Sequence, residues 1–210
     1  MWIEKPPFWF RWLFPGVVFR MPESDSKPGR VFITFDDGPI PEATPWVLET
    51  LDKFNVKATF FMVGQNIEKH PDIFHDVVRR GHIVANHSLH HIRGLGISAA
   101  DYRRDVDACE KYTRSGLFRP SHGYLTPRQL MEVKKDYRVI MFDLVTRDYS
   151  KNVTPQDVVN NVKRHARDGS IIVFHESVKS IDKLKTALPQ SLRWLKEQGY
   201  ETGVLEGWKD

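Results

Sequence analysis

The sequence has a single cysteine, no block of consecutive basic residues that would track a phosphate backbone, and no apolar run long enough to cross a bilayer. Cys109 forms no internal disulfide, and its place in a charged, helix-like stretch predicts a packed thiol rather than a nucleophile. The 31 Lys and Arg residues nearly balance 27 Asp and Glu residues, so the formal charge is only +4. We therefore expect no nucleic-acid partner.

The apolar content suits one folded domain. Of 210 residues, 40% are hydrophobic and 12% are aromatic, which excludes a disordered or fibrous chain. This length closes one sizeable core and is too short for two independent domains. We expect an aromatic arm and connector over residues 1–29 and one domain over residues 30–210.

The N-terminal segment, residues 8–14, is the most aromatic part of the chain. It is shorter than the roughly 20 apolar residues of a membrane span, contains Arg11 and is followed by Pro15-Gly16. Glu4 and two prolines replace a basic n-region, so we predict no secretory signal, and a cytoplasmic or membrane-peripheral location is the default expectation. Two interpretations stay open: the arm packs over the domain, or it makes peripheral membrane contact as an interfacial anchor.

Short apolar runs alternate with longer amphipathic stretches after residue 29. The runs are continuous and rich in β-branched and aromatic residues, which predicts strands covered on both faces, at residues 31–35, 58–63, 82–85, 139–142 and 171–174. Capping residues and hydrophobic spacing predict helices at residues 45–54, 71–80, 99–113, 155–167 and 181–198. This alternation predicts an α/β fold with a mainly parallel sheet.

Two adjacent carboxylates follow the first predicted strand. In parallel βα folds, reactive side chains collect after the carboxyl ends of the strands. Asp36 and Asp37 occupy such a position, where burial is costly without a positive partner. Because side chains alternate along extended chain, the two should point differently and serve different purposes. A strand-terminal turn that caps the next helix is the purely structural interpretation.

A pair of histidines follows the third predicted strand. His87 and His91 are four residues apart, and a helical turn would place both imidazoles on one face, close enough to hold one metal ion. With Asp37 as third ligand, the set leaves a position open for water, as in a hydrolytic zinc site. Solvated histidines are the alternative, and His90 falls on another face.

Two later strand ends add a proton donor and a cation. His175 follows the last strong strand, and an imidazole beside a carboxylate suits protonation of a leaving amine. Asp143 and Asp148 both follow the run at 139–142 and are the candidate carboxylates. Arg119 can hold an aspartate ionised, and the loop after it can present backbone N–H groups to an oxyanion.

Taken in order, these segments resemble the polysaccharide deacetylase family, the NodB-homology domains of carbohydrate esterase family 4. The resemblance covers nearly everything from residue 31 to about residue 204, with five motifs in the right sequence. It implies a distorted, incomplete (β/α) barrel and a catalytic domain over residues 30–210. It also implies a metal-dependent hydrolase that removes N-acetyl groups from amino sugars in a peptidoglycan- or chitin-like glycan.

The motifs assign roles by resemblance. The segment TFDDGP resembles the first motif and implies Asp36 as general base and Asp37 as a metal ligand. The segment HSLHH resembles the second motif and implies His87 and His91 as the other protein ligands. The ion implied is one divalent cation, zinc in the first place, with cobalt, nickel or manganese as alternatives.

The remaining motifs supply the acid and its supports. The segment RPSHG resembles the third motif and implies that Arg119 pairs with Asp36. The dipeptide Asp148-Tyr149 resembles the end of the fourth motif, and VFH resembles the fifth, which implies His175 as general acid with Asp148 as its partner.

Three positions depart from the family pattern. His122 stands where the family usually has Tyr, and the resemblance implies that the backbone N–H at this position donates to the oxyanion. Around the acetyl methyl group, Tyr149 replaces Trp and Val173 replaces Leu. These changes alter the shape of the cleft rather than its chemistry. Two alternatives stay open: the same site acting on O-acetyl esters or a small non-sugar amide, and a metal-bearing sugar-binding protein without turnover.

Overall fold

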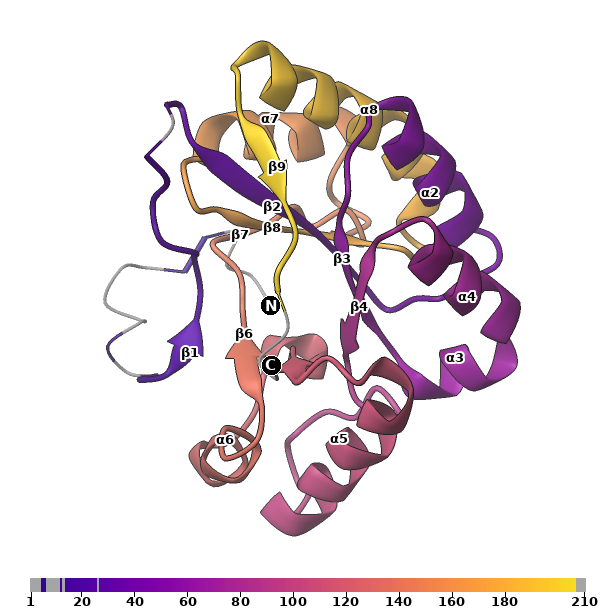
Figure 1. The fold of residues 1–210 in the computed structure, drawn as a ribbon, viewed down its shortest axis with the longest axis vertical. Helices are drawn as coiled ribbons and strands as arrows, with labels where there is room; N and C mark the ends of the chain where they lie inside the picture. Colours follow the sequence, from indigo (N-terminus) through magenta and orange to yellow (C-terminus); the bar gives the residue numbers. More distant parts are fainter. Residues whose placement is uncertain (1–4, 7–11, 13, 26, 207–210) are drawn as a thin grey trace.

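The computed structural model describes residues 5–6, 12, 14–25 and 27–206. In this part of the chain, nine strands form one sheet curved into a half-barrel, with helices along its outer side (Figure 1). The strand order is β1-β6-β5-β4-β3-β2-β8-β7, with β9 paired to β2, and the pairings between these strands are parallel. The predicted incomplete α/β barrel is confirmed.

The strands are β1 (Val17–Val18), β2 (Arg30–Asp36), β3 (Thr59–Met62), β4 (Ile83–Asn86), β5 (Leu117–Phe118), β6 (Arg138–Ile140), β7 (Leu144–Val145), β8 (Ile171–His175) and β9 (Glu201–Gly203). The helices are α2 (Thr44–Lys53), α3 (Gly64–Lys69), α4 (Pro71–Arg79), α5 (Ala99–Thr113), α6 (Pro127–Val133), α7 (Pro155–His165) and α8 (Ile181–Glu197), with a 3₁₀ turn η1 (Ser121–Gly123). All five predicted strands and all five predicted helices are present. The sequence analysis missed α3, α6 and the short strands β1, β5, β7 and β9.

Alternation along the strands separates a helix-covered face from an inner face. On β2, Ile33 and Phe35 pack in the large core that also contains side chains of α2, α7 and α8. Phe32 points to the other side and joins a smaller cluster built from strand residues inside the half-barrel. Since side chains alternate, Asp36 lies on the same inner face as Phe32. Its register partner on β8 is His175, so the two polar side chains meet at one strand end.

The N-terminal segment adds a strand to the sheet. β1 pairs with β6, and Phe19 directly after it is 3% exposed in a cluster with Phe142 and Val173. Most of the aromatic stretch at residues 8–14, namely residues 8–11 and 13, lies outside the described residues, so the packing of the arm and its membrane contact stay predictions. None of the helices in the described part of the chain has the length and apolarity of a membrane span.

Candidate active site

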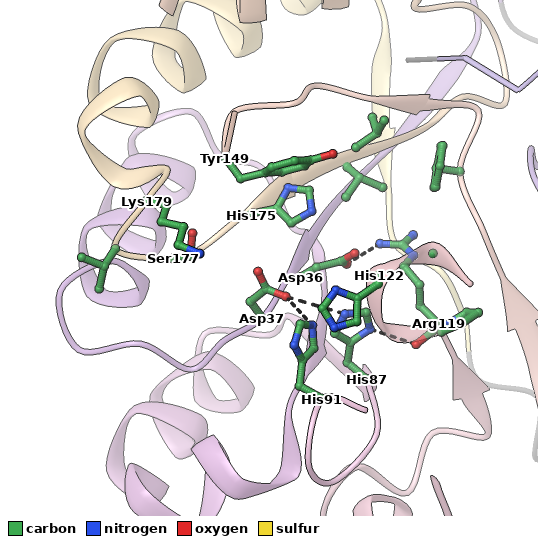
Figure 2. A pocket seen from close by; sticks show the side chains of 16 residues that line it. Asp36, Asp37, His87, His91, Arg119, His122, Tyr149, His175, Ser177 and Lys179 are labelled. Atoms are coloured by element: carbon green, nitrogen blue, oxygen red, sulfur yellow. Dashed lines mark hydrogen bonds and ion pairs between the residues drawn. The ribbon is translucent and has the colours of Figure 1, made fainter. Parts of the chain in front are cut away.

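A cavity of about 440 Å³ opens at the carboxyl ends of the strands. Nine of the ten residues predicted for the site line it, contributed by β2, β8 and the segments that follow β4, β5 and β7 (Figure 2). The tenth, Asp148, is completely buried behind His175. Segments more than 130 residues apart in sequence therefore contribute to a single site.

A buried ion pair links the strand ends of β2 and β5. Arg119 Nη1 donates to Asp36 Oδ1 at 2.6 Å and to Thr34 Oγ1 at 2.9 Å, and Nη2 donates to the carbonyl of Met141 at 3.1 Å. The guanidinium also lies over the ring of Phe61, 3.9 Å from its centroid. Burial lowers the pKa of Arg119 and the adjacent carboxylate raises it, with burial the larger effect. The pair holds a carboxylate and a cation at the floor of the cavity, and Asp36 Oδ2 accepts no hydrogen bond from the described residues.

Asp37, His87 and His91 form a group whose ligand atoms lie within 4.8 Å of one another. His91 Nε2 is 3.1 Å and His87 Nε2 is 3.7 Å from Asp37 Oδ1. Burial disfavours the charged form of His87 and lowers its pKa to about 4, so the ring is neutral at pH 7. Its Nδ1 lies 2.9 Å from the carbonyl of Arg119, an acceptor, which leaves the Nε2 lone pair directed at the site.

These donors fit a divalent cation. Two imidazoles and one carboxylate are a ligand set of open hydrolytic zinc sites. Burial raises the pKa of Asp37, but the neighbouring histidines outweigh it and hold the pKa below its usual value, so the carboxylate is ionised. The fit rests on this chemistry and on the convergence of three side chains from two strand ends.

The helical turn expected for residues 87–91 is wrong. This segment is an irregular loop in which Ser88 and His91 have left-handed backbone angles, with φ of 67° and 52°. Long-range hydrogen bonds shape the loop: Ser121 Oγ donates to the carbonyl of His87 at 2.8 Å, and Asp105 accepts from the backbone N–H of Leu89 at 2.9 Å. The two imidazoles still come together, with ring centroids 5.2 Å apart.

The second half of the site is a histidine held by a carboxylate. His175 Nδ1 lies 2.8 Å from Asp148 Oδ1, and the His175 backbone N–H donates to Oδ2 at 2.8 Å. Burial lowers the pKa of His175, but Asp148, together with smaller contributions from Asp37 and Asp36, outweighs it and raises the pKa to about 9. Of the two candidate carboxylates, Asp143 is engaged elsewhere, accepting from Arg167 and from Ser170. Asp148 is therefore the partner of His175.

The residues that depart from the family pattern form the walls. His122 lies in η1 with a φ of 59°, and its ring is 4.5 Å from that of His91. Within the described chain, its backbone N–H donates no hydrogen bond, which leaves this donor available to a ligand. On the opposite wall, the Tyr149 ring contacts His175 edge-on at 4.6 Å, and Val173 is buried beside it.

The sequence analysis missed several contributors. Ser177, Val178 and Lys179, from the turn after β8, line the cavity together with Phe142 and Val145. Phe142 ends the predicted strand at 139–142 and the other four follow predicted strands, which could have marked them, since lining residues collect at strand ends in such folds.

Comparison with known proteins agrees with this geometry. A family model described as polysaccharide deacetylase matches residues 23–137. The peptidoglycan-N-acetylglucosamine deacetylase of Bacillus cereus is 32% identical over 192 residues, covering 88% of each chain. A solved peptidoglycan N-acetylglucosamine deacetylase has a TM-score of 0.85 and 29% identity over 95% of both chains. A carbohydrate esterase family 4 pseudoenzyme from Bacillus anthracis has a TM-score of 0.76 and 26% identity over 89% of this chain and 66% of its own.

The family match spans more than half of this chain, from the segment before β2 to the end of the loop after α6. The sequence similarity to the Bacillus cereus enzyme extends it to nearly the whole length. Half-barrel, motif order and overall similarity lead to one conclusion: the chain belongs to the polysaccharide deacetylase family.

Proposed function

We propose that this chain hydrolyses the N-acetyl group of N-acetylglucosamine residues in a peptidoglycan-like glycan. The observation that carries the proposal is that one cavity combines a carboxylate paired with Arg119, a ligand set for a divalent ion and an imidazole paired with Asp148. These are the three parts that metal-assisted amide hydrolysis needs. Residues 30–210 are the proposed catalytic domain.

The cofactor we propose is one divalent cation held by Asp37, His87 and His91. Zinc is the first candidate because imidazole and carboxylate ligands suit it, and cobalt, nickel and manganese are the alternatives. When bound, such an ion polarises a carbonyl oxygen and favours ionisation of water.

Asp36 is the proposed general base. Arg119 donates a 2.6 Å charge-assisted hydrogen bond to its Oδ1 and fixes the position of the carboxylate. Its Oδ2 is then the atom that takes the proton from the water attacking the acetyl carbon. This attack converts the planar amide carbon to a tetrahedral centre with a negatively charged oxygen.

His122 and His175 serve the later stages. The backbone N–H of His122 is the proposed donor to the tetrahedral oxyanion. His175, kept protonated by Asp148, donates a proton to the departing amine nitrogen, so the sugar leaves as a free amine and the acetyl group as acetate. Tyr149 and Val173 enclose the acetyl methyl group.

The test is acetate release from a substrate panel by the metal-loaded chain. We expect release from N-acetyl oligosaccharides and peptidoglycan strands, abolished by a chelator and restored by zinc. Release from acetylated xylan or small amides alone would assign the same site to another acyl substrate. Binding of the oligosaccharide without any release would place the chain with turnover-deficient relatives such as the Bacillus anthracis pseudoenzyme.

A further inference from the structure

One buried carboxyl group beside the site has no part in the mechanism above. Glu176 follows His175 directly at the end of β8 and is completely buried. The Thr44 hydroxyl is near enough to act on it, yet within the described residues neither Glu176 oxygen has a hydrogen bond of normal geometry. A buried polar group without partners is costly to the fold, so its retention calls for an explanation.

The Glu176 side chain packs on the turn that carries the two aspartates. A Cβ added to Gly38 would lie 1.6 Å from Glu176 Oε1 and 2.3 Å from its Cδ. The φ of Gly38 lies outside the left-handed region, so its backbone conformation does not require glycine. The close contact with Glu176 is what excludes a side chain at this position. The Glu176 backbone N–H also donates to the carbonyl of Asp36 at 3.1 Å.

The surroundings of this carboxyl group disfavour its charged form. Burial raises the pKa of Glu176 well above its usual value, and the negative charges of Asp37 and Asp36 act in the same direction. The side chain fills the space under the turn that carries Asp36 and Asp37. Its contribution is then one of shape.

We propose that Glu176 is a positioning residue whose side chain, seated against Gly38, sets the turn of Asp36 and Asp37 relative to the histidines of the site. The role of that turn in metal binding and proton transfer rests on the proposed function. The contact between the two residues rests on the geometry alone. Removing the side chain opens a cavity under the turn, and enlarging Gly38 pushes the turn away.

A double-mutant cycle in zinc affinity, measured by titration of the full chain, tests the proposal. Glu176→Ala should weaken zinc binding about tenfold or more, as expected for loss of a group that supports a ligand. It should lower kcat at saturating zinc more than it raises KM. Glu176→Gln, which keeps the shape of the side chain, should stay within about twofold of the wild type in zinc affinity and in kcat. Gly38→Ala alone should lose zinc affinity, and adding Glu176→Ala should recover part of it, since the new methyl group enters the vacated space.

Gly203→Ala is the matched control. Its added Cβ would lie 2.7 Å from Arg30 Cδ, at the opposite end of β2, so crowding there should leave zinc affinity unchanged and should gain nothing from Glu176→Ala. Thermal unfolding of each variant confirms that the measured chain is folded. If Glu176→Ala alone fails to fold, the test uses Glu176→Gln and the comparison of Gly38→Ala with the Gly38→Ala/Glu176→Ala double variant.

Three results would overturn the proposal: unchanged zinc affinity in Glu176→Ala, equal losses in the Ala and Gln variants, or strictly additive losses in the cycle. Failure of the proposed function is a separate result, because it would appear as a wild-type protein that binds zinc and releases no acetate. The cycle in zinc affinity does not depend on turnover.

Discussion

Replacing Asp148 with Asn should move the alkaline limb of the pH–rate profile to lower pH. Asp148 accepts hydrogen bonds from the ring and from the backbone of His175, both at 2.8 Å. Asparagine keeps the shape of the side chain and removes the negative charge that stabilises the imidazolium form. The sign follows directly: without the anion, the pKa of His175 falls and the ring loses its proton earlier as the pH rises.

The pKa of His175 is about 9, because Asp148, with smaller contributions from Asp37 and Asp36, outweighs the effect of burial. At pH 8, about 90% of such a ring is protonated, against about 3% for a ring at the ordinary value near 6.5. The rate at pH 8 should therefore fall by about tenfold or more, and the loss should shrink as the pH is lowered. A bound cation repels the imidazolium in both proteins, so their difference isolates the Asp148 charge.

The assay is acetate release from a soluble N-acetyl oligosaccharide between pH 5 and pH 9 at saturating zinc. Asp143→Asn is the matched control, because Asp143 bonds Arg167 and Ser170 rather than His175. It should leave the alkaline limb in place. An unmoved limb in Asp148→Asn would refute His175 as the acid that Asp148 tunes.

Three further predictions concern the ion, the fold and the pH dependence of stability. His91→Ala should lose the ion, measured as bound zinc per chain after dialysis; stoichiometric zinc in a variant that lacks both His87 and His91 would contradict the ligand set. Asp143→Ala should lower the free energy of unfolding by about 1–3 kcal/mol in urea titrations, since it leaves the buried Ser170 hydroxyl without its acceptor; an equal midpoint would contradict this. The pKa of His175 is raised in the folded chain to about 9, so its contribution to the free energy of unfolding is complete below about pH 6.5 and is lost as the pH rises through 9. The melting temperature of the metal-free wild type should therefore fall between these pH values, and that of Asp148→Asn should fall less.

The long, continuous apolar runs made the sheet predictable. Each run of β2, β3 and β8 is buried on both faces, so its composition alone marks it as a strand of a parallel sheet. Side-chain alternation predicted different directions for Asp36 and Asp37, but it does not extend to Asp37. That residue lies past the end of β2 with a left-handed φ of 81°, and both carboxylates line the same cavity. The two-residue strands β1, β5 and β7 are too short to carry such a pattern, and long-range pairing alone defines them.

The histidine loop shows where local pattern fails. A spacing of four residues suggested a helical turn for His87 and His91, but the left-handed angles of Ser88 and His91 exclude one. Hydrogen bonds from Ser121 and to Asp105, residues far along the chain, hold the loop in shape. Such contacts leave no trace in the local sequence, so the pairing of the imidazoles could be predicted and its geometry could not.

Long-range contacts also decide between Asp143 and Asp148 as the partner of His175. Both follow the same apolar run and have the same side chain, so position after the run could not decide which one meets His175, and only the resemblance of Asp148-Tyr149 to the fourth family motif pointed to Asp148. The decision lies with Arg167 and Ser170, which approach from the loop between α7 and β8 and engage Asp143.

The most direct test of the account is acetate release by zinc-loaded Asp36→Asn beside the zinc-loaded wild type. Asp36 contacts Arg119 and lies outside the ligand set, so the variant should keep about one zinc per chain and still bind the oligosaccharide. Without its base it should release acetate at least about 10²-fold more slowly. Near-wild-type turnover with zinc retained, or loss of the zinc itself, would contradict the assignment of Asp36 as the base.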